Sequence, residues 1–308
     1  MVTNQSSVKK STPIPAPYPQ YSPIVDRDPV HWPHNARVAV WVMVSVEHFA
    51  FGSPGTALYP HINQQPEIAN YGWRDYGNRV GIWRLFDIFE DLEVPVTVCM
   101  NADTIDYYPR IVEHVISKNW CILASGLNNN SVGHSQMPLD TERKIVGATV
   151  NKFKQHLGRV PHGWMTPNYD ISMETYNIIQ EAGLRYTTDW VNDDQPFWQE
   201  TANGKLLHIP NSLECNDHFL SFAARMPGPE FAGAIEDTFD QLWSDGGKSG
   251  RVMAIGLHSF ISGQPMRAQY VRQFLQHIKK REQVWLTTAD AIYDFTANPE
   301  TWQEDHDW

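Results

Sequence analysis

The chain has 308 residues and a formal net charge of −11 at pH 7, and hydrophobic residues make up 42% of it. This acidic balance argues against nucleic acid or an anionic membrane surface as the main partner, because both would repel the chain. No stretch approaches the roughly 18 consecutive apolar residues that a membrane-spanning helix needs. We therefore expect neither nucleic acid nor a membrane as a partner.

Residues 1–35 contain seven prolines, which are incompatible with a helix or a central strand. We expect an extended arm whose second half, from about Tyr18 and including Tyr21 and Trp32, docks on the body or on a neighbouring subunit. Residues 36–297 then form a single body, and residues 298–308 form a C-terminal tail.

Strands and helices alternate along this body. Short apolar runs predict buried strands, and apolar residues spaced three and four apart predict amphipathic helices. In chain order we expect a strand at 37–46, a helix at 77–92, a strand at 94–100, a helix at 107–118, a strand at 120–124, a helix at 140–157, a strand at 162–165, a helix at 172–182, strands at 186–190 and 206–210, a helix at 231–243, a strand at 252–257, a helix at 269–281 and a strand at 284–287.

This order predicts an α/β fold built from βα units around a parallel sheet. No dinucleotide-binding fingerprint follows the first strand, so a distorted (β/α) barrel of seven or eight strands is favoured over an open doubly wound sheet.

The cysteines and the N-terminus bear on the cellular compartment. Cys99, Cys121 and Cys215 are an odd set without CxxC spacing, which is typical of a reduced protein. The first ten residues lack the apolar core of a secretory signal. We therefore expect a cytoplasmic protein.

The run Arg251–His258 is the most informative stretch of the chain. A strand buried on both faces ends there in an imidazole, and a loop containing Gly263 and Pro265 follows. In α/β enzymes a histidine at the mouth of a strand can carry acid–base chemistry. The alternative is a core histidine with a satisfied hydrogen bond.

Polar side chains also follow the other predicted strands, and in a parallel barrel these positions converge on one face. They are Ser45, Glu47, His48, Asn101, Asp103, Ser125, Asn128, Asn129, Trp164, Asn168, Asp189 and Trp190. A carboxylate and an imidazole that face each other can divide the base and acid roles in hydrolysis. Glu47 and His258 are the candidates for these roles.

Several of these residues admit a second interpretation. Glu47 could instead cap a helix or pair with an arginine. Ser125 could be a nucleophile activated by His258, although no G-x-S-x-G turn is present. The consecutive asparagines 128–130 could simply form a turn. A metal site could also be rebuilt around Glu47 by histidines, the candidates being His48, His61 and His134.

Four motifs carry a family resemblance. They are Arg74–Leu85, Gly163–Trp164 with Pro167, Tyr186–Trp190 with Asp193–Pro196, and Gly256–Arg267. Through them residues 32–295 resemble the polysaccharide deacetylase (NodB-homology) superfamily, in particular its cytoplasmic branch of metal-independent allantoinases and cyclic-imide hydrolases. The resemblance implies a distorted (β/α) barrel, hydrolysis of an amide carbon–nitrogen bond, and often a homotetramer.

The chain departs from the metal-dependent members of that superfamily. Their Asp-x-Asp motif is replaced here by Ser45-Val46-Glu47, and their His-x3-His motif by Ser125 and Asn129. Serine and asparagine are poor zinc ligands. Met165 and Thr166 stand where the third motif has an arginine. We therefore predict no bound metal and no other cofactor.

We thus predict a hydrolase that cleaves an amide, imide or ureide bond in a small molecule, by ring opening or deacylation. Water would be activated by Glu47 or His258, and the protein would be a homo-oligomer, either a tetramer or a dimer. The expected substrate-binding residues are Ser125, Asn129, Trp164, Asp189, Trp190 and Arg267. The alternatives are a non-catalytic binding protein or pseudoenzyme, and a metal-dependent N-deacetylase with substitute ligands.

Overall fold

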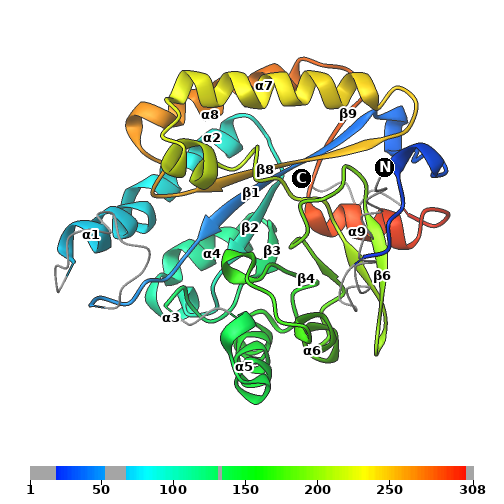
Figure 1. Ribbon diagram of the computed structural model, residues 1–308. Coiled ribbons are helices and arrows are strands. Elements are labelled where there is room, and N and C mark those ends of the chain that lie inside the picture. Colours follow the sequence, from blue (N-terminus) through cyan, green and yellow to red (C-terminus); the bar gives the residue numbers. More distant parts are fainter. Residues whose placement is uncertain (1–18, 53–66, 131–133, 303–308) are drawn as a thin grey trace, which may run out of the picture.

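The computed structural model describes residues 19–52, 67–130 and 134–302 (Figure 1). In these ranges one sheet runs in the order β6-β7-β5-β4-β3-β2-β1-β8, and β9 also pairs with β1. The strands are β1 (Val38–Val46), β2 (Val96–Met100), β3 (Cys121–Ala124), β4 (Gly163–Trp164), β5 (Tyr186–Thr187), β6 (Phe197–Thr201), β7 (Gly204–His208), β8 (Arg251–His258) and β9 (Val284–Thr287).

All neighbouring strands of this sheet are parallel except the antiparallel hairpin of β6 and β7. The sheet curves into a half-barrel, so the predicted α/β barrel of parallel strands is confirmed. Strand β6 was not predicted, because it is an edge strand that lacks a continuous apolar run. Among the described residues, an isolated β-bridge from Asn216 to Gly256 joins the segment after β7 to β8.

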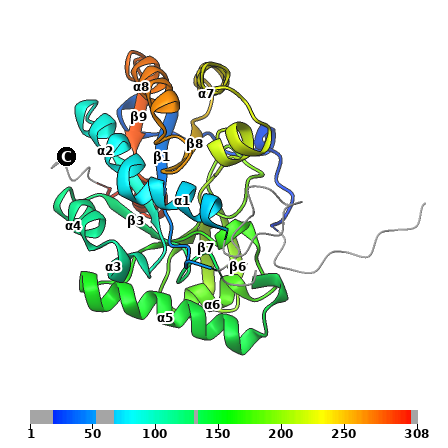
Figure 2. The same cartoon turned by 90° about the vertical axis from the view of Figure 1, so that its left-hand side faces the viewer.

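The helices surround the curved sheet, as Figures 1 and 2 show. They are α1 (Ile68–Tyr76), α2 (Ile82–Asp91), α3 (Thr104–Tyr107), α4 (Pro109–Ser117), α5 (Leu139–Leu157), α6 (Thr175–Glu181), α7 (Gly228–Asp245), α8 (Pro265–Lys279) and α9 (Ala289–Ala297). Among these described helices, none is long and apolar enough to cross a bilayer.

Strand β1 is buried along its whole length. Its alternate residues Ala39, Trp41 and Met43 pack inside the barrel. The intervening valines pack against the surrounding helices. Because side chains alternate with a period of two, Ser45 and then Glu47 continue the inner row at the carboxyl end of the strand.

The described part of the N-terminal arm lies against the opposite end of the barrel. Trp32 is buried, donates a hydrogen bond from Nε1 to the Arg251 carbonyl at 2.8 Å, and contacts Trp285. Arg27 forms a bidentate ion pair with Asp193 at 2.8 and 2.7 Å. The predicted docking is confirmed for these residues. Tyr21 is 92% exposed, so its docking on the body of the same chain is wrong, and Tyr18 lies outside the described residues.

The helix predicted at 77–92 is part of a longer helical stretch. Helices α1 and α2 are joined by a π-helical turn over Gly77–Gly81. A Cβ on Gly77 or Gly81 would collide with the loop after β8, at Ser259 and its neighbours. These glycines therefore let the helix approach the loop closely, which brings α1 to the mouth of the barrel (Figure 2).

His208, at the end of β7, is a buried histidine without a hydrogen-bond partner in the described chain. Its ring stacks on Phe197 with centroids 4.9 Å apart and meets Tyr176 edge-on at 5.0 Å. Burial lowers the pKa of His208 to about 3, so the ring is neutral in the folded protein near pH 7.

We predict that His208 makes the fold sensitive to acid. The unfolded chain binds a proton at His208 near pH 6.5 and the folded chain does not, so stability falls as the pH drops below that value. The loss is roughly 1.4 kcal/mol per pH unit. Urea unfolding between about pH 7 and about pH 5 should show a shallower decline for His208→Leu than for the wild-type protein. The control His156→Leu removes an exposed histidine and should decline like the wild type, whereas equal slopes for all three proteins would contradict the prediction.

Candidate active site

The two predicted catalytic residues, Glu47 and His258, lie at the same end of the barrel. Strands β1 and β8 are parallel neighbours, and His258 stands in register with Ser45, two residues before Glu47. All three positions belong to the inner rows of their strands. The carboxylate of Glu47 also acts electrostatically on the imidazole by raising the pKa of His258. The structure therefore brings the predicted acid–base pair together.

A chain of asparagines orients Glu47. The Asn129 side-chain amide donates a hydrogen bond to Glu47 Oε1. Asn101 in turn donates to Asn129 Oδ1 at 3.0 Å, and it accepts a hydrogen bond from the His48 amide at 2.9 Å. Glu47 Oε2 is buried and accepts no hydrogen bond from the described residues. The hydrogen bond therefore fixes Oε1, whereas Oε2 is able to accept a proton.

A buried carboxylate, Asp217, holds His258. The His258 Nδ1 lies 2.7 Å from Asp217 Oδ1, and its backbone amide donates to Asp217 Oδ2 at 2.8 Å. Ser262 Oγ donates to the same Oδ2 at 2.6 Å. This arrangement keeps a proton on Nδ1, so Nε2 is the nitrogen that is left for a substrate.

The charge balance favours protonated His258. Burial by itself lowers the pKa of His258, but the charge and hydrogen bond of Asp217, aided by Glu47, outweigh burial and raise the pKa above 6.5. A pKa raised in this direction suits a side chain that donates a proton in hydrolysis.

Asp217 was missed by the sequence analysis because it does not follow a predicted strand. It lies beyond β7, next to the isolated bridge between Asn216 and Gly256 that sets it beside His258. A bridge of one residue pair leaves no periodic pattern, so the sequence offers no local signal for this contact.

Aromatic side chains pack around His258. Trp73 meets Phe260 at 4.7 Å and Phe222 at 4.9 Å, and Phe260 lies 5.6 Å from His258. His218 lies 5.4 Å from His258, and burial together with the charge of His258 lowers the pKa of His218 to about 4. These rings present flat, largely apolar surfaces that can exclude water from a bound planar group.

The predicted substrate-binding residues separate into two groups. Ser125 and Asn129 lie at the acid–base pair: the buried Ser125 follows β3, and its carbonyl accepts a hydrogen bond from Asn101. In the described chain no hydrogen bond joins Ser125 to His258, so the geometry gives no support to Ser125 as a nucleophile. Trp190 is half-buried and packs against the outer core.

Three other predicted substrate-binding residues form hydrogen bonds within the surrounding loops. Trp164 is fully buried in the outer core, and its Nε1 donates to Thr166 Oγ1 at 3.0 Å. Asp189 accepts two hydrogen bonds from Thr166, at 2.7 and 2.8 Å. Arg267 donates to the carbonyl of Met226 at 3.3 Å, beyond the segment that carries Phe222. The structure thus gives these side chains partners outside the acid–base pair.

The residues at the carboxyl end of the barrel do not fit a zinc ion. Asn129 faces Glu47 as a hydrogen-bond donor, and neither Asn129 nor Ser125 is a favourable zinc ligand. His48 stacks on Tyr107 at 3.9 Å, His134 pairs with Glu142 at 3.0 Å, and His61 lies outside the described residues. Among the described residues, no group of three histidine, cysteine or acidic side chains could hold a metal.

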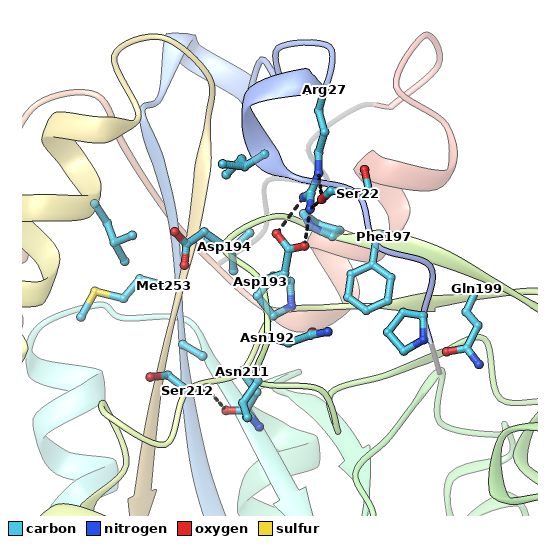
Figure 3. Close-up of a pocket in the computed structure, with 18 of the residues that line it drawn as sticks. Ser22, Arg27, Asn192, Asp193, Asp194, Phe197, Gln199, Asn211, Ser212 and Met253 are labelled. Atoms are coloured by element: carbon cyan, nitrogen blue, oxygen red, sulfur yellow. Dashed lines mark hydrogen bonds and ion pairs between the residues drawn. The ribbon is translucent and has the colours of Figure 1, made fainter. Parts of the chain in front are cut away.

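A pocket of about 1230 Å³ lies elsewhere, between the edge strands β6 and β8 (Figure 3). It is enclosed by the arm near Ser22, the loop around Asp193, the segment after β7 and Met253 of β8. No histidine lines it, and its wall includes neither Glu47 nor His258. The acid–base geometry, rather than this cavity, therefore marks the candidate active site.

Comparisons with known proteins show which proteins this chain is similar to. Residues 72–187 match the family model for polysaccharide deacetylase. A putative polysaccharide deacetylase of Schizosaccharomyces pombe is 25% identical over 305 residues, which covers 87% of this chain and 92% of the relative. A probable polysaccharide deacetylase of Pseudomonas aeruginosa PAO1 superposes with a TM-score of 0.80 at 24% identity, covering 90% of this chain and 96% of that one. The chain is therefore similar to polysaccharide deacetylases in sequence and in fold.

The crystal structure of PuuE allantoinase is also similar, with a TM-score of 0.80 and 23% identity. The match covers 90% of this chain and 96% of that one. At this identity the likeness shows a shared fold. The superfamily itself indicates a hydrolase that acts on carbon–nitrogen bonds other than peptide bonds.

We predict that Asp217→Asn lowers the pKa of His258. The substitution removes the negative charge that outweighs burial, while an amide of nearly the same shape remains. Histidine-selective NMR titration, with the His258 signal assigned through His258→Gln, should show the shift directly. The control Asp240→Asn removes the partner of His277, at 3.1 Å on the surface, and should leave the His258 titration unchanged. An unaltered pKa in Asp217→Asn would contradict the assignment of the pair.

Proposed function

We propose that this protein hydrolyses an amide, imide or ureide bond of a small molecule, with Glu47 as the base and His258 as the acid and without a bound metal. The observation that carries the proposal is the Asp217–His258 pair facing Glu47 at the carboxyl end of the barrel. The likeness to an allantoinase supports a small cyclic ureide or imide as the substrate.

In the proposed reaction, Glu47 Oε2 removes a proton from water as the water oxygen attacks the substrate carbonyl carbon. The carbonyl electrons move onto its oxygen to give a tetrahedral oxyanion. When these electrons return, the carbon–nitrogen bond breaks and His258 Nε2 donates its proton to the leaving nitrogen. The products are a carboxylic acid, which releases its proton to solvent as a carboxylate, and an amine or amide. Proton transfer from Glu47 to His258 through solvent then restores both groups.

Each surrounding contact has a role in this scheme. Asn129 holds Glu47 in one orientation, and Asn101 holds Asn129. Asp217 fixes the His258 ring and, against the effect of burial, raises the pKa of His258. The rings of Trp73 and Phe260 offer flat surfaces for a planar ring.

The alternative functions receive less support. A pseudoenzyme has no need for a carboxylate–imidazole pair held by a second buried carboxylate. A metal-dependent N-deacetylase would need ligands that Ser125 and Asn129 do not supply. The cytoplasmic branch, the cytoplasmic location and a homo-oligomer, either a tetramer or a dimer, are further proposals that rest on the sequence.

We predict that Glu47→Gln and His258→Gln each lower kcat by roughly 10²- to 10⁴-fold with little change in melting temperature. Turnover would be measured on hydantoin, allantoin, succinimide and simple N-acetyl amines. The control His277→Gln alters a histidine that is also paired with a carboxylate but lies on α8, and it should retain full turnover. A wild-type enzyme that hydrolyses a substrate equally well after either substitution would overturn the assigned roles.

We also predict that treatment with a chelator leaves turnover and melting temperature unchanged, because the donor set around Glu47 does not suit zinc. The double variant Ser125→His/Asn129→His should gain zinc affinity, and each single variant should gain much less, since metal ligands act as a set. Elemental analysis and calorimetric zinc titration would measure both effects. Stoichiometric zinc in the purified wild type, lost together with activity on chelation, would contradict the metal-free proposal.

A further inference from the structure

We infer that Arg74, on α1, is a catalytic residue that stabilises the oxyanion formed on the substrate carbonyl and afterwards binds the carboxylate product. This inference rests on the proposed function. The juxtaposition that carries it is a buried guanidinium packed against Phe49 and Phe260, which follow Glu47 and His258 by two residues.

The position of Arg74 is well defined. Its guanidinium carbon lies 4.0 Å from the ring centre of Phe49, two residues after Glu47, and 5.3 Å from that of Phe260, two residues after His258. Asn70, one turn earlier on α1, accepts a hydrogen bond from Arg74 Nε at 3.2 Å. The side chain is therefore anchored at its Nε, and the charged end stands between the residues that follow the base and the acid.

Electrostatics agree with this placement. Burial lowers the pKa of Arg74, and the nearby carboxylates of Glu47 and Glu67 counteract that effect. The charge of Arg74 acts in the opposite direction on the imidazole, because it lowers the pKa of His258. Arg74 is thus within electrostatic reach of both members of the acid–base pair.

No other cation in the described chain occupies such a position. Arg74 is the one buried arginine or lysine among the described residues. Arg79, on the same helical stretch, is exposed and pairs with Asp75. Arg84 donates to the Gly263 carbonyl and to Tyr76.

The chemistry needs such a charge. Attack of water on a carbonyl places a full negative charge on oxygen, and preorganised donors at that oxygen usually contribute the largest single part of the catalytic effect. A guanidinium offers donors in a planar fork that suits an oxyanion and, after the carbon–nitrogen bond breaks, the two oxygens of a carboxylate. In a site where the donor set does not suit a metal, Arg74 supplies the positive charge.

The test compares Arg74→Gln, Arg74→Lys and Arg74→Ala with the wild type on the substrate panel above. Loss of an oxyanion donor should lower kcat by roughly 10²- to 10³-fold in Arg74→Gln, with a smaller change in KM. Arg74→Lys should retain part of the lost rate, and added guanidinium ion should partly restore turnover in Arg74→Ala. The matched control Arg79→Gln, whose exposed side chain pairs only with Asp75 among the described residues, should behave like the wild type.

A binding measurement separates this inference from the proposed function. N-carbamoylglycine, the carboxylate that hydantoin ring opening would yield, is titrated into each variant by isothermal titration calorimetry. Binding by the wild type and Arg79→Gln that is at least about tenfold weaker in Arg74→Gln supports the inference even if no substrate is turned over. It is overturned by equal binding in all variants, by no binding in the wild type, or by a kcat that survives in folded Arg74→Gln.

Discussion

Strand β1 pairs on both edges with other strands, and the position of the candidate site follows from that constraint. Strand β8 lies along one edge, while β9 pairs with its first half and β2 with its second half. A strand enclosed in this way cannot slip by one residue, because a slip would exchange its inner and outer side chains. Trp41 therefore stays inside the barrel, and Glu47 emerges on the same inner row. The parallel partner β8 brings His258 to the same height.

A second constraint acts on the histidine. A buried imidazole alone would lose its proton, since burial disfavours the charged form. Asp217, itself fully buried, reverses this effect through its charge and its hydrogen bond to Nδ1. The cost of burying that carboxylate is offset by three donors: the His258 ring, the His258 amide and Ser262. The protonated form of His258 is therefore favoured because Asp217 lies beside it.

The charged groups of the proposed site are all side chains of the protein. Two acidic side chains, Glu47 and Asp217, act on the basic side chain of His258, and a second basic group, Arg74, is buried against aromatic rings. Interactions between charges are stronger in such an environment than in water, so the placement of each group matters more than its number of contacts. The glycines at 77 and 81 contribute indirectly, because they let α1 approach the loop after β8 and so position Arg74 near Phe260.

The sequence by itself determined the alternation of strands and helices, the parallel barrel and the ends of β1 and β8, because buried strands and amphipathic helices leave local periodic patterns. Glu47 and His258 could be selected for that reason. The tertiary structure alone decided the partners that lie far apart in the chain. Asp217 reaches His258 through an isolated bridge, Arg74 arrives on a helix bent by a π-helical turn, and Trp164 faces the outer core. Such contacts depend on how complete elements pack against one another, and packing leaves no periodic signal in the sequence.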